Sequence, residues 1–65
     1  MTINSKIHQI RKSKNISQAE LAYETGYTID DIIEIEKDGT IINAYTLLQI
    51  LTALNITIDE FKNWS

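Results

Sequence analysis

The sequence predicts a compact all-α domain of five short helices. Apolar residues recur three and four positions apart over most of the chain, as on one face of a helix, and no segment has the alternating pattern of a surface strand. Two helix starts are indicated within this pattern. Glu20 stands three residues after Ser17, and Glu60 stands three residues after Thr57, which is the spacing of a capping box. With no proline and two glycines, nothing indicates a linker or a low-complexity segment.

The length of 65 residues allows one domain with a modest core. The chain has no cysteine, which excludes a disulfide or a thiolate metal site, and no apolar run approaches membrane-spanning length. Residues 1–8 lack the apolar region of a secretory signal, so we expect a cytoplasmic protein without membrane association. The only histidine, His8, is expected to be solvated and to lack an acid–base partner. We therefore expect no enzymatic activity, no metal and no cofactor.

The first helix is predicted from about residue 3 to residue 14. Ile3, Ile7 and Ile10 share one face, which we expect to be buried. Either Thr2 or Asn4 can cap the start of this helix. The side chains expected to point outward are Lys6, Gln9, Lys12 and Ser13.

Residues 17–37 are predicted to form two further helices joined by a tight turn. The first of them begins near Gln18 and directs Leu21 and Ala22 inward, and Gly26 supplies the left-handed residue at its end. Thr28 can cap the next helix, in which Asp30 and Asp31 favour the dipole and Ile32 and Ile35 face the core. Many proteins use this unit to place the second helix in the DNA major groove.

Two more helices are predicted between about residues 43 and 64. Gly39 permits the preceding turn, Asn43 or Thr40 can cap the fourth helix, and Thr57 begins the fifth. The fourth helix carries a wide apolar face that we expect to be mostly buried: Leu47, Leu48, Ile50, Leu51 and Leu54. The aromatic residues expected at the margin of the core are Tyr23, Tyr27, Tyr45, Phe61 and Trp64.

The formal net charge of −3 conceals a strong asymmetry along the chain. Residues 1–17 carry four cations and no acid, whereas residues 18–38 carry seven acids against Lys37 alone. A DNA-binding surface normally concentrates cations, so the acidic middle segment is the main argument against DNA binding.

The whole pattern resembles the lambda-repressor-like helix-turn-helix domain of the Cro and phage-repressor family, often called the XRE family. The motifs that carry the resemblance are I-x-x-I-R at residues 7–11, I-S-Q-A-E-L-A at 16–22, Gly26, I-x-x-I-E at 32–36, and T-L-L-Q-I-L-T-A-L-N-I-T-I-D-E-F at 46–61. The closing L-N-I-T-I-D-E-F is also similar to the N-terminal domains of peptide-responsive regulators. The resemblance implies one helix-turn-helix domain over residues 1–65.

Several site residues follow from the resemblance. It implies a structural ion pair between Arg11 and Glu36, which fixes the orientation of the helices more than it adds stability. The residues implied to line the phosphate-contacting rim are Lys12, Lys14, Ser17 and Gln18. The residues implied to face the bases are Thr28, Ile29, Asp30, Asp31 and Glu34.

This chain departs from the family at the base-facing positions, where acids and isoleucines replace the usual polar and basic residues. A carboxylate can accept a hydrogen bond from cytosine N4, and isoleucine can touch a thymine methyl, so base readout is retained as an expectation. The loop after the third helix lacks the usual cations, and Asp38 stands where a glycine is usual. We expect weak electrostatic affinity for DNA and a shallow salt dependence.

Two classes of function stay open. The favoured one is a sequence-specific DNA-binding domain of a transcriptional regulator, whose partner is double-stranded DNA. The alternative is a protein-interaction module, in which Ile29, Ile33, Ile41 and Ile42 form an exposed apolar patch beside the acids. Ile33 is equally compatible with partial burial against the fourth helix. A monomer or a weak homodimer on DNA is expected, with Leu48, Phe61 and Trp64 as candidate dimer contacts.

Overall fold

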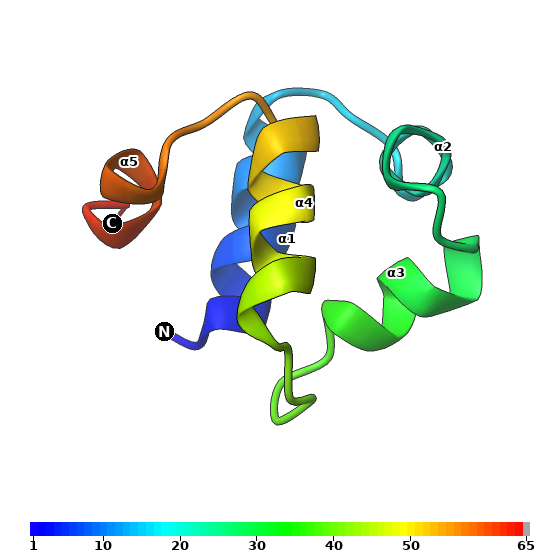
Figure 1. Ribbon diagram of the computed structural model, residues 1–65, viewed down its shortest axis with the longest axis horizontal. Helices are drawn as coiled ribbons and strands as arrows, with labels where there is room; N and C mark the ends of the chain where they lie inside the picture. The colour runs from blue at the N-terminus through cyan, green and yellow to red at the C-terminus, as the bar shows by residue number, and fades with distance from the viewer. Residues whose placement is uncertain (65) are drawn as a thin grey trace.

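The computed structural model describes residues 1–64, and Ser65 lies outside the described residues. Five helices follow one another, α1 (Ile3–Ser13), α2 (Gln18–Thr25), α3 (Ile29–Ile35), α4 (Ala44–Ala53) and α5 (Ile58–Lys62) (Figure 1). Residues 1–64 contain no strand, and the predicted all-α class of five helices is confirmed. None of these helices has the length and apolar character needed to cross a bilayer.

Side-chain caps explain where each helix starts. The capping boxes predicted at Ser17 and Thr57 are present. Each of these side chains accepts a hydrogen bond from the backbone N–H of the glutamate three residues on, and that glutamate side chain accepts one from the backbone N–H of the capping residue. Thr28 with Asp31, and Thr2 with Ser5, form the same arrangement, while Asn43 caps α4. Asn15 adopts the left-handed conformation just after α1, with φ 58°.

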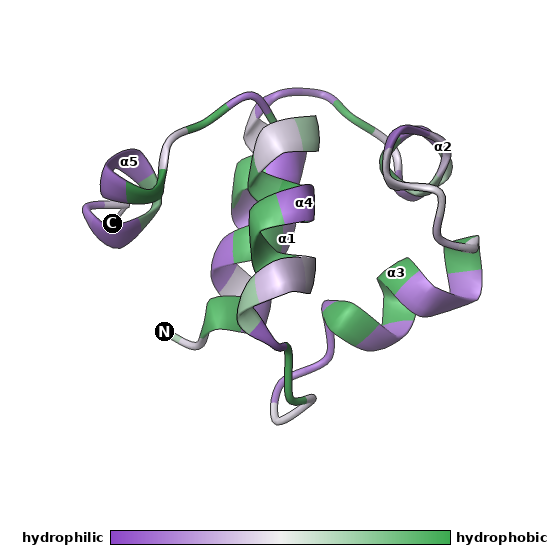
Figure 2. Ribbon diagram, in the orientation of Figure 1, coloured by the Kyte–Doolittle hydropathy of each residue, from purple (hydrophilic) through white to green (hydrophobic). Residues whose placement is uncertain are grey.

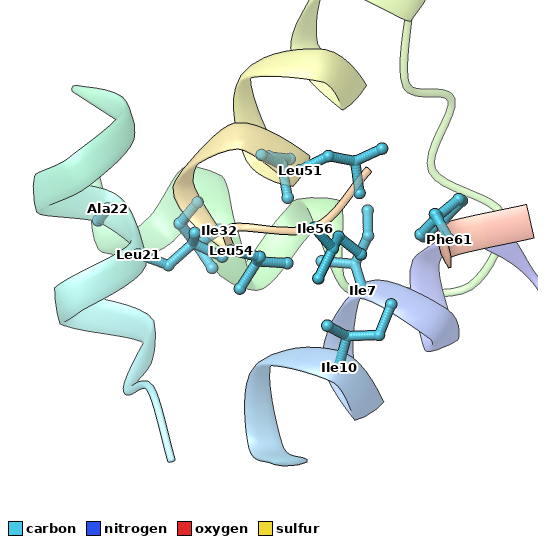
Figure 3. Close-up of a cluster of buried hydrophobic side chains, with 10 residues drawn as sticks. Ile7, Ile10, Leu21, Ala22, Ile32, Leu51, Leu54, Ile56 and Phe61 are labelled. Carbon is cyan, nitrogen blue, oxygen red and sulfur yellow. The ribbon is translucent and has the colours of Figure 1, made fainter. Parts of the chain in front are cut away.

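The core gathers side chains from all five helices and from the segment that joins α4 to α5 (Figure 3). It consists of Ile7, Ile10, Leu21, Ala22, Ile32, Ile50, Leu51, Leu54, Ile56 and Phe61. Burying each large aliphatic side chain of this kind contributes about 1.5–3 kcal/mol. The core therefore holds α3 in place through Ile32, which is fully buried, and leaves the opposite side of α3 free.

Four apolar residues predicted to be buried or at the core margin are instead exposed. Leu48 is 53% exposed, because α4 packs on one side only and the position after Leu47 falls outside that face. Tyr23 and Tyr45 are exposed for the same reason, each pointing away from the buried residues of its helix. Ile3 is 47% exposed at the open end of α1.

Asn4 takes the inward position at that end of α1. Its side chain is buried, and its Nδ2 donates to the carbonyl oxygens of Ile35 at 2.7 Å and Thr40 at 3.0 Å. Asn4 was predicted only as an alternative cap, whereas Thr2 caps the helix. The amide of Asn4 instead joins α1 to the end of α3 and to the loop that follows.

Lys6 also differs from its predicted outward orientation. Its Nζ donates to the carbonyl oxygen of Phe61 at 3.1 Å and lies 5.2 Å from the centre of the Phe61 ring. A cation near the last carbonyls of a helix and over an aromatic ring is favourable on both counts. Lys6 therefore attaches α5 to α1 and is not a free surface charge.

Candidate nucleic-acid interface

The turn between α2 and α3 is built by Gly26. This residue has φ 81°, and its N–H donates to the carbonyl of Ala22 at 2.9 Å, which closes the last turn of α2. A left-handed residue at this position ends the helix and reverses the chain, and glycine adopts that conformation without strain. Thr28 then starts α3 after only Tyr27. The two helices consequently pack against each other, with α3 at one edge of the molecule (Figure 1).

The capping box of α3 uses two of the residues predicted to face the bases. Thr28 Oγ1 accepts from the N–H of Asp31 at 3.0 Å, and Asp31 Oδ2 accepts from the N–H of Thr28 at 3.0 Å. Each of these side chains is exposed but already has a structural partner. Thr28 and Asp31 therefore serve to begin the helix. The other predicted base-facing residues, Ile29, Asp30 and Glu34, take no part in this capping box.

Apolar and hydrophilic residues alternate along α3 (Figure 2), and its exposed residues are isoleucines and acids. Ile29 is 48% exposed and Ile33 is 38% exposed, so each presents part of its side chain to water, and partial burial of Ile33 stays compatible with this exposure. Asp30 and Glu34 are exposed beside them, and Glu34 Oε2 lies 3.1 Å from Lys37 Nζ. Because both partners of that pair are more than half exposed, it adds little stability.

Three of the four isoleucines predicted as an apolar patch are exposed, namely Ile29, Ile33 and Ile41. Ile41 is 95% exposed, but Ile42 is partly buried against the core. These two line an open groove of about 280 Å³ with Asp31 and Glu34, and neither Ile29 nor Ile33 lines it. Ile29 and Ile33, four positions apart on α3, form a partly exposed apolar edge of that helix.

Arg11 and Glu36 hold the end of α3 against α1. Arg11 Nε donates to Glu36 Oε2 at 2.6 Å, and Arg11 Nη2 donates to Glu36 Oε1 at 3.1 Å. The side chains are 7% and 5% exposed. Arg11 Nη1 also donates to the carbonyl of Ile16 at 2.8 Å, so one guanidinium fixes the chain entering α2 as well. This bidentate geometry sets the position of α3 relative to α1.

Glu36 accepts two further contacts that connect all three helices of the site. His8 Nδ1 lies 2.9 Å from Glu36 Oε1, and Gln18 Nε2 donates to the same oxygen at 3.2 Å. His8 is half exposed but is not the unpartnered residue that was predicted. The sequence signal that pairs it with Glu36 is its position, one turn of α1 before Arg11.

These contacts determine the protonation of Glu36. Burial of the carboxyl raises its pKa, but hydrogen bonds from Arg11, His8 and Gln18 and the charge of Arg11 lower it more. The pKa of Glu36 therefore lies below the ordinary value for glutamic acid. The carboxylate is ionised at neutral pH, as its role in the ion pair requires.

The predicted phosphate-contacting residues lie where α1 ends and α2 begins. Lys12, Ser17 and Gln18 line one open polar groove of about 490 Å³, while Lys14 is exposed at the end of α1 outside it. The hydroxyl of Ser17 is used in the cap of α2, and Gln18 is partly buried on Glu36. Lys12 and Lys14 are the residues of this set with free, exposed charges.

The arrangement of α2, turn and α3 defines a helix-turn-helix protein. A protein-family model described as Helix-turn-helix matches residues 7–61, which is most of the chain. The chain belongs to this helix-turn-helix family, the lambda-repressor-like or XRE class, whose members are typically DNA-binding transcription regulators. No curated protein and no solved structure matches the chain.

Proposed function

We propose that this protein is the sequence-specific DNA-binding domain of a transcriptional regulator, and that α3 enters the major groove of double-stranded DNA. The observation that carries the proposal is the helix-turn-helix itself, with α3 anchored to α1 by Arg11 and Glu36 while its other side is solvent-exposed. A rigid helix with a free outer face is what groove insertion needs.

The exposed side chains of α3 suggest how bases would be read. Asp30 and Glu34 have carboxylates that accept hydrogen bonds from cytosine N4, and Ile29 and Ile33 can touch the methyl group of thymine. In this proposal Thr28 and Asp31 contact DNA only at the start of α3, because their side chains already bond to each other's backbone N–H groups. Such an interface favours cytosine and thymine on the strand that α3 faces.

The rim of the proposed contact carries little positive charge. Arg11 is buried and paired, and Lys6 is held by the carbonyl of Phe61, so Lys12 and Lys14 are the cations of α1 available to phosphates. With a slope of about −0.9 per neutralised phosphate, log K against log salt should fall with a slope of only about −2 per domain. Acids beside the phosphates reduce the affinity further.

A titration of a fluorescent duplex, followed by anisotropy at several salt concentrations, tests this proposal. We expect weak binding at low salt with the shallow slope given above, and amide shift changes in residues 12–18 and 28–34 on addition of the same duplex. Absence of binding at the lowest salt would contradict the proposal. Shift changes confined to α4 and α5 would contradict the site.

The exposed edge formed by Ile29 and Ile33 supports a second candidate function, a protein-interaction module that uses α3. Two isoleucines at i and i+4, beside Asp30 and Glu34, suit a basic and apolar partner protein. Replacing Ile29 and Ile33 with Ser should abolish capture of such a partner and leave the fold intact, because both side chains are exposed. For this function, no duplex should bind at any salt concentration.

A weak homodimer on DNA belongs to the same proposal, but its candidate contacts change. Phe61 is buried, so it could reach an interface only if the domain unfolded. Trp64 packs against the core. Leu48 is the exposed member of the three.

A further inference from the structure

We propose that the solvent face shared by α2 and α4 is a docking surface for a basic amphipathic helix of another protein. The surface, called here the α2–α4 face, comprises Glu20, Tyr23, Glu24, Tyr45, Leu48 and Ala53. The proposal does not rest on DNA binding, because no residue of α3 belongs to this face.

The α2–α4 face consists of two shallow depressions that meet. One, of about 530 Å³, is lined by Tyr23 and Glu20, and the other, of about 470 Å³, is lined by Tyr45 and Leu48. Glu24 and Ala53 line both, so the two depressions form one continuous surface. Its long side follows α4, whose ten residues extend about 15 Å.

Three large side chains on this face are exposed to water. Tyr23 is 86% exposed, Tyr45 is 70% exposed and Leu48 is 53% exposed. Single exposed apolar residues are ordinary on a monomer, whereas several gathered around adjoining depressions are typical of an interaction site. Tyrosine is also among the residues enriched in protein interfaces and in their hot spots.

Tyr45 is connected to a hydrogen-bonded chain behind it. Tyr27 Oη donates to Gln49 Oε1 at 2.5 Å, and Gln49 Nε2 lies 3.4 Å from Tyr45 Oη. Because the amide of Gln49 is fixed by Tyr27, it presents one N–H toward the Tyr45 hydroxyl. A side chain oriented in this way loses less entropy when a partner binds, and so contributes more to affinity.

The charge of the face selects the chemistry of the partner. Glu20 and Glu24 line the depressions, and within residues 1–64 no Lys, Arg or His lines them. Glu20 uses Oε1 to cap α2, while Glu24 has no ion pair in the described part of the chain. Free carboxylate oxygens beside tyrosine rings suit the guanidinium of arginine, which can pair with the acid and stack on the ring.

The shape of the face indicates a helical occupant. A depression between two packed helices accepts a third helix, which can place apolar residues at i, i+3, i+4 and i+7 against Leu48 and Ala53 and its arginines against Glu24. DNA is disfavoured because the acids would lie beside phosphates. Because no residue of α3 belongs to the α2–α4 face, a helix bound there leaves α3 uncovered.

An NMR titration with a synthetic helix of arginine and leucine in that spacing, about four turns long, tests the proposal. We expect amide shift changes centred on residues 20–24 and 45–53, with none from a matched peptide in which every arginine is glutamate. Equal effects of both peptides, or changes confined to α3, would overturn it. Concentration-dependent shifts in the same residues without peptide would also overturn it, because the occupant would then be a second copy of the chain.

Two variants of the face and one control variant sharpen this experiment. The double change Y45Q and L48Q keeps good helix-forming residues in α4 and should weaken binding of the arginine peptide about thirty-fold or more. The control I41Q removes an isoleucine that is 95% exposed and lies outside the face, and it should bind as the wild type does. The charge reversal E24R should reduce binding of the arginine peptide and produce binding of the glutamate peptide. Unchanged affinity in both α2–α4 variants would refute the assignment, provided their amide spectra show an intact fold.

Discussion

Arg11 and Glu36, which are 25 positions apart in the chain, form the one ion pair with both side chains buried in residues 1–64. Arg11 faces the core side of α1, and Glu36 is the residue at which α3 ends. Their contact fixes the end of α3, whose other side carries the proposed function. A buried charge without its partner is strongly unfavourable, so this pair is vulnerable to the loss of either member.

Replacing Arg11 or Glu36 alone with Ala should lower the free energy of unfolding by about 3 kcal/mol. Urea unfolding followed by circular dichroism measures this change. The double variant R11M/E36L, which leaves no unpaired buried charge, should be much less destabilised than the sum of the two single variants. Single-variant losses of the size found for surface residues, within about 0.5 kcal/mol, would contradict the importance of the pair.

The lowered pKa of Glu36 predicts loss of stability in acid. The folded-state pKa lies below the unfolded-state value, so the contribution of Glu36 is fully present above the unfolded pKa. It should be lost as the pH falls through the lower, folded pKa. Unfolding measured from neutral pH to about pH 2 should show this, and E36Q should remove part of the pH dependence. An E36Q curve parallel to the wild-type curve would show that other carboxylates are responsible.

Replacing Asn4 with Ala should destabilise the domain by about 2 kcal/mol, because the partly buried carbonyls of Ile35 and Thr40 would lose their donor. Asn4→Asp should cost more, since a carboxylate would then face two carbonyl oxygens. Gln9→Ala, at an exposed position of the same helix, serves as the control. If thermal unfolding gave Asn4→Ala and the control the same midpoint, the structural role of Asn4 would be contradicted.

Replacing Asp30 and Glu34 with Gln should increase non-specific DNA affinity about fivefold at low salt, if each acid opposes binding by ~0.5 kcal/mol. The salt slope should also steepen, because Lys37 loses its partner Glu34 and becomes available to phosphate. Any preference for cytosine should fall at the same time. The matched variant E24Q/D59N has the same change in formal charge away from α3, and an equal gain in its anisotropy titration would assign the effect to net charge alone.

Sequence alone was sufficient for the starts of α2, α3 and α5, whereas it left two candidate caps each for α1 and α4. Ser17 with Glu20 and Thr57 with Glu60 meet within one turn, so the hydrogen bonds that begin α2 and α5 depend only on spacing along the chain. Gly26 could be placed in the turn for a similar local reason, and its φ of 81° is the conformation that glycine permits. The family followed from the same local motifs, because they cover most of the chain.

Tertiary packing decided which apolar and polar side chains face the core. Leu48 and Tyr45 have the spacing of a wide apolar face, but in a small domain α4 is covered on one side only, which leaves both in water. Asn4 finds a partner 31 positions away, and no rule of spacing along the chain reveals that contact. The contact of His8 with Glu36, 28 positions away, is signalled only by the place of His8 one turn before Arg11. The sequence by itself thus determined the helices and the turn, since these depend on neighbours within one helical turn. The exposed α2–α4 face and the cluster around Glu36 arise only when distant segments pack together.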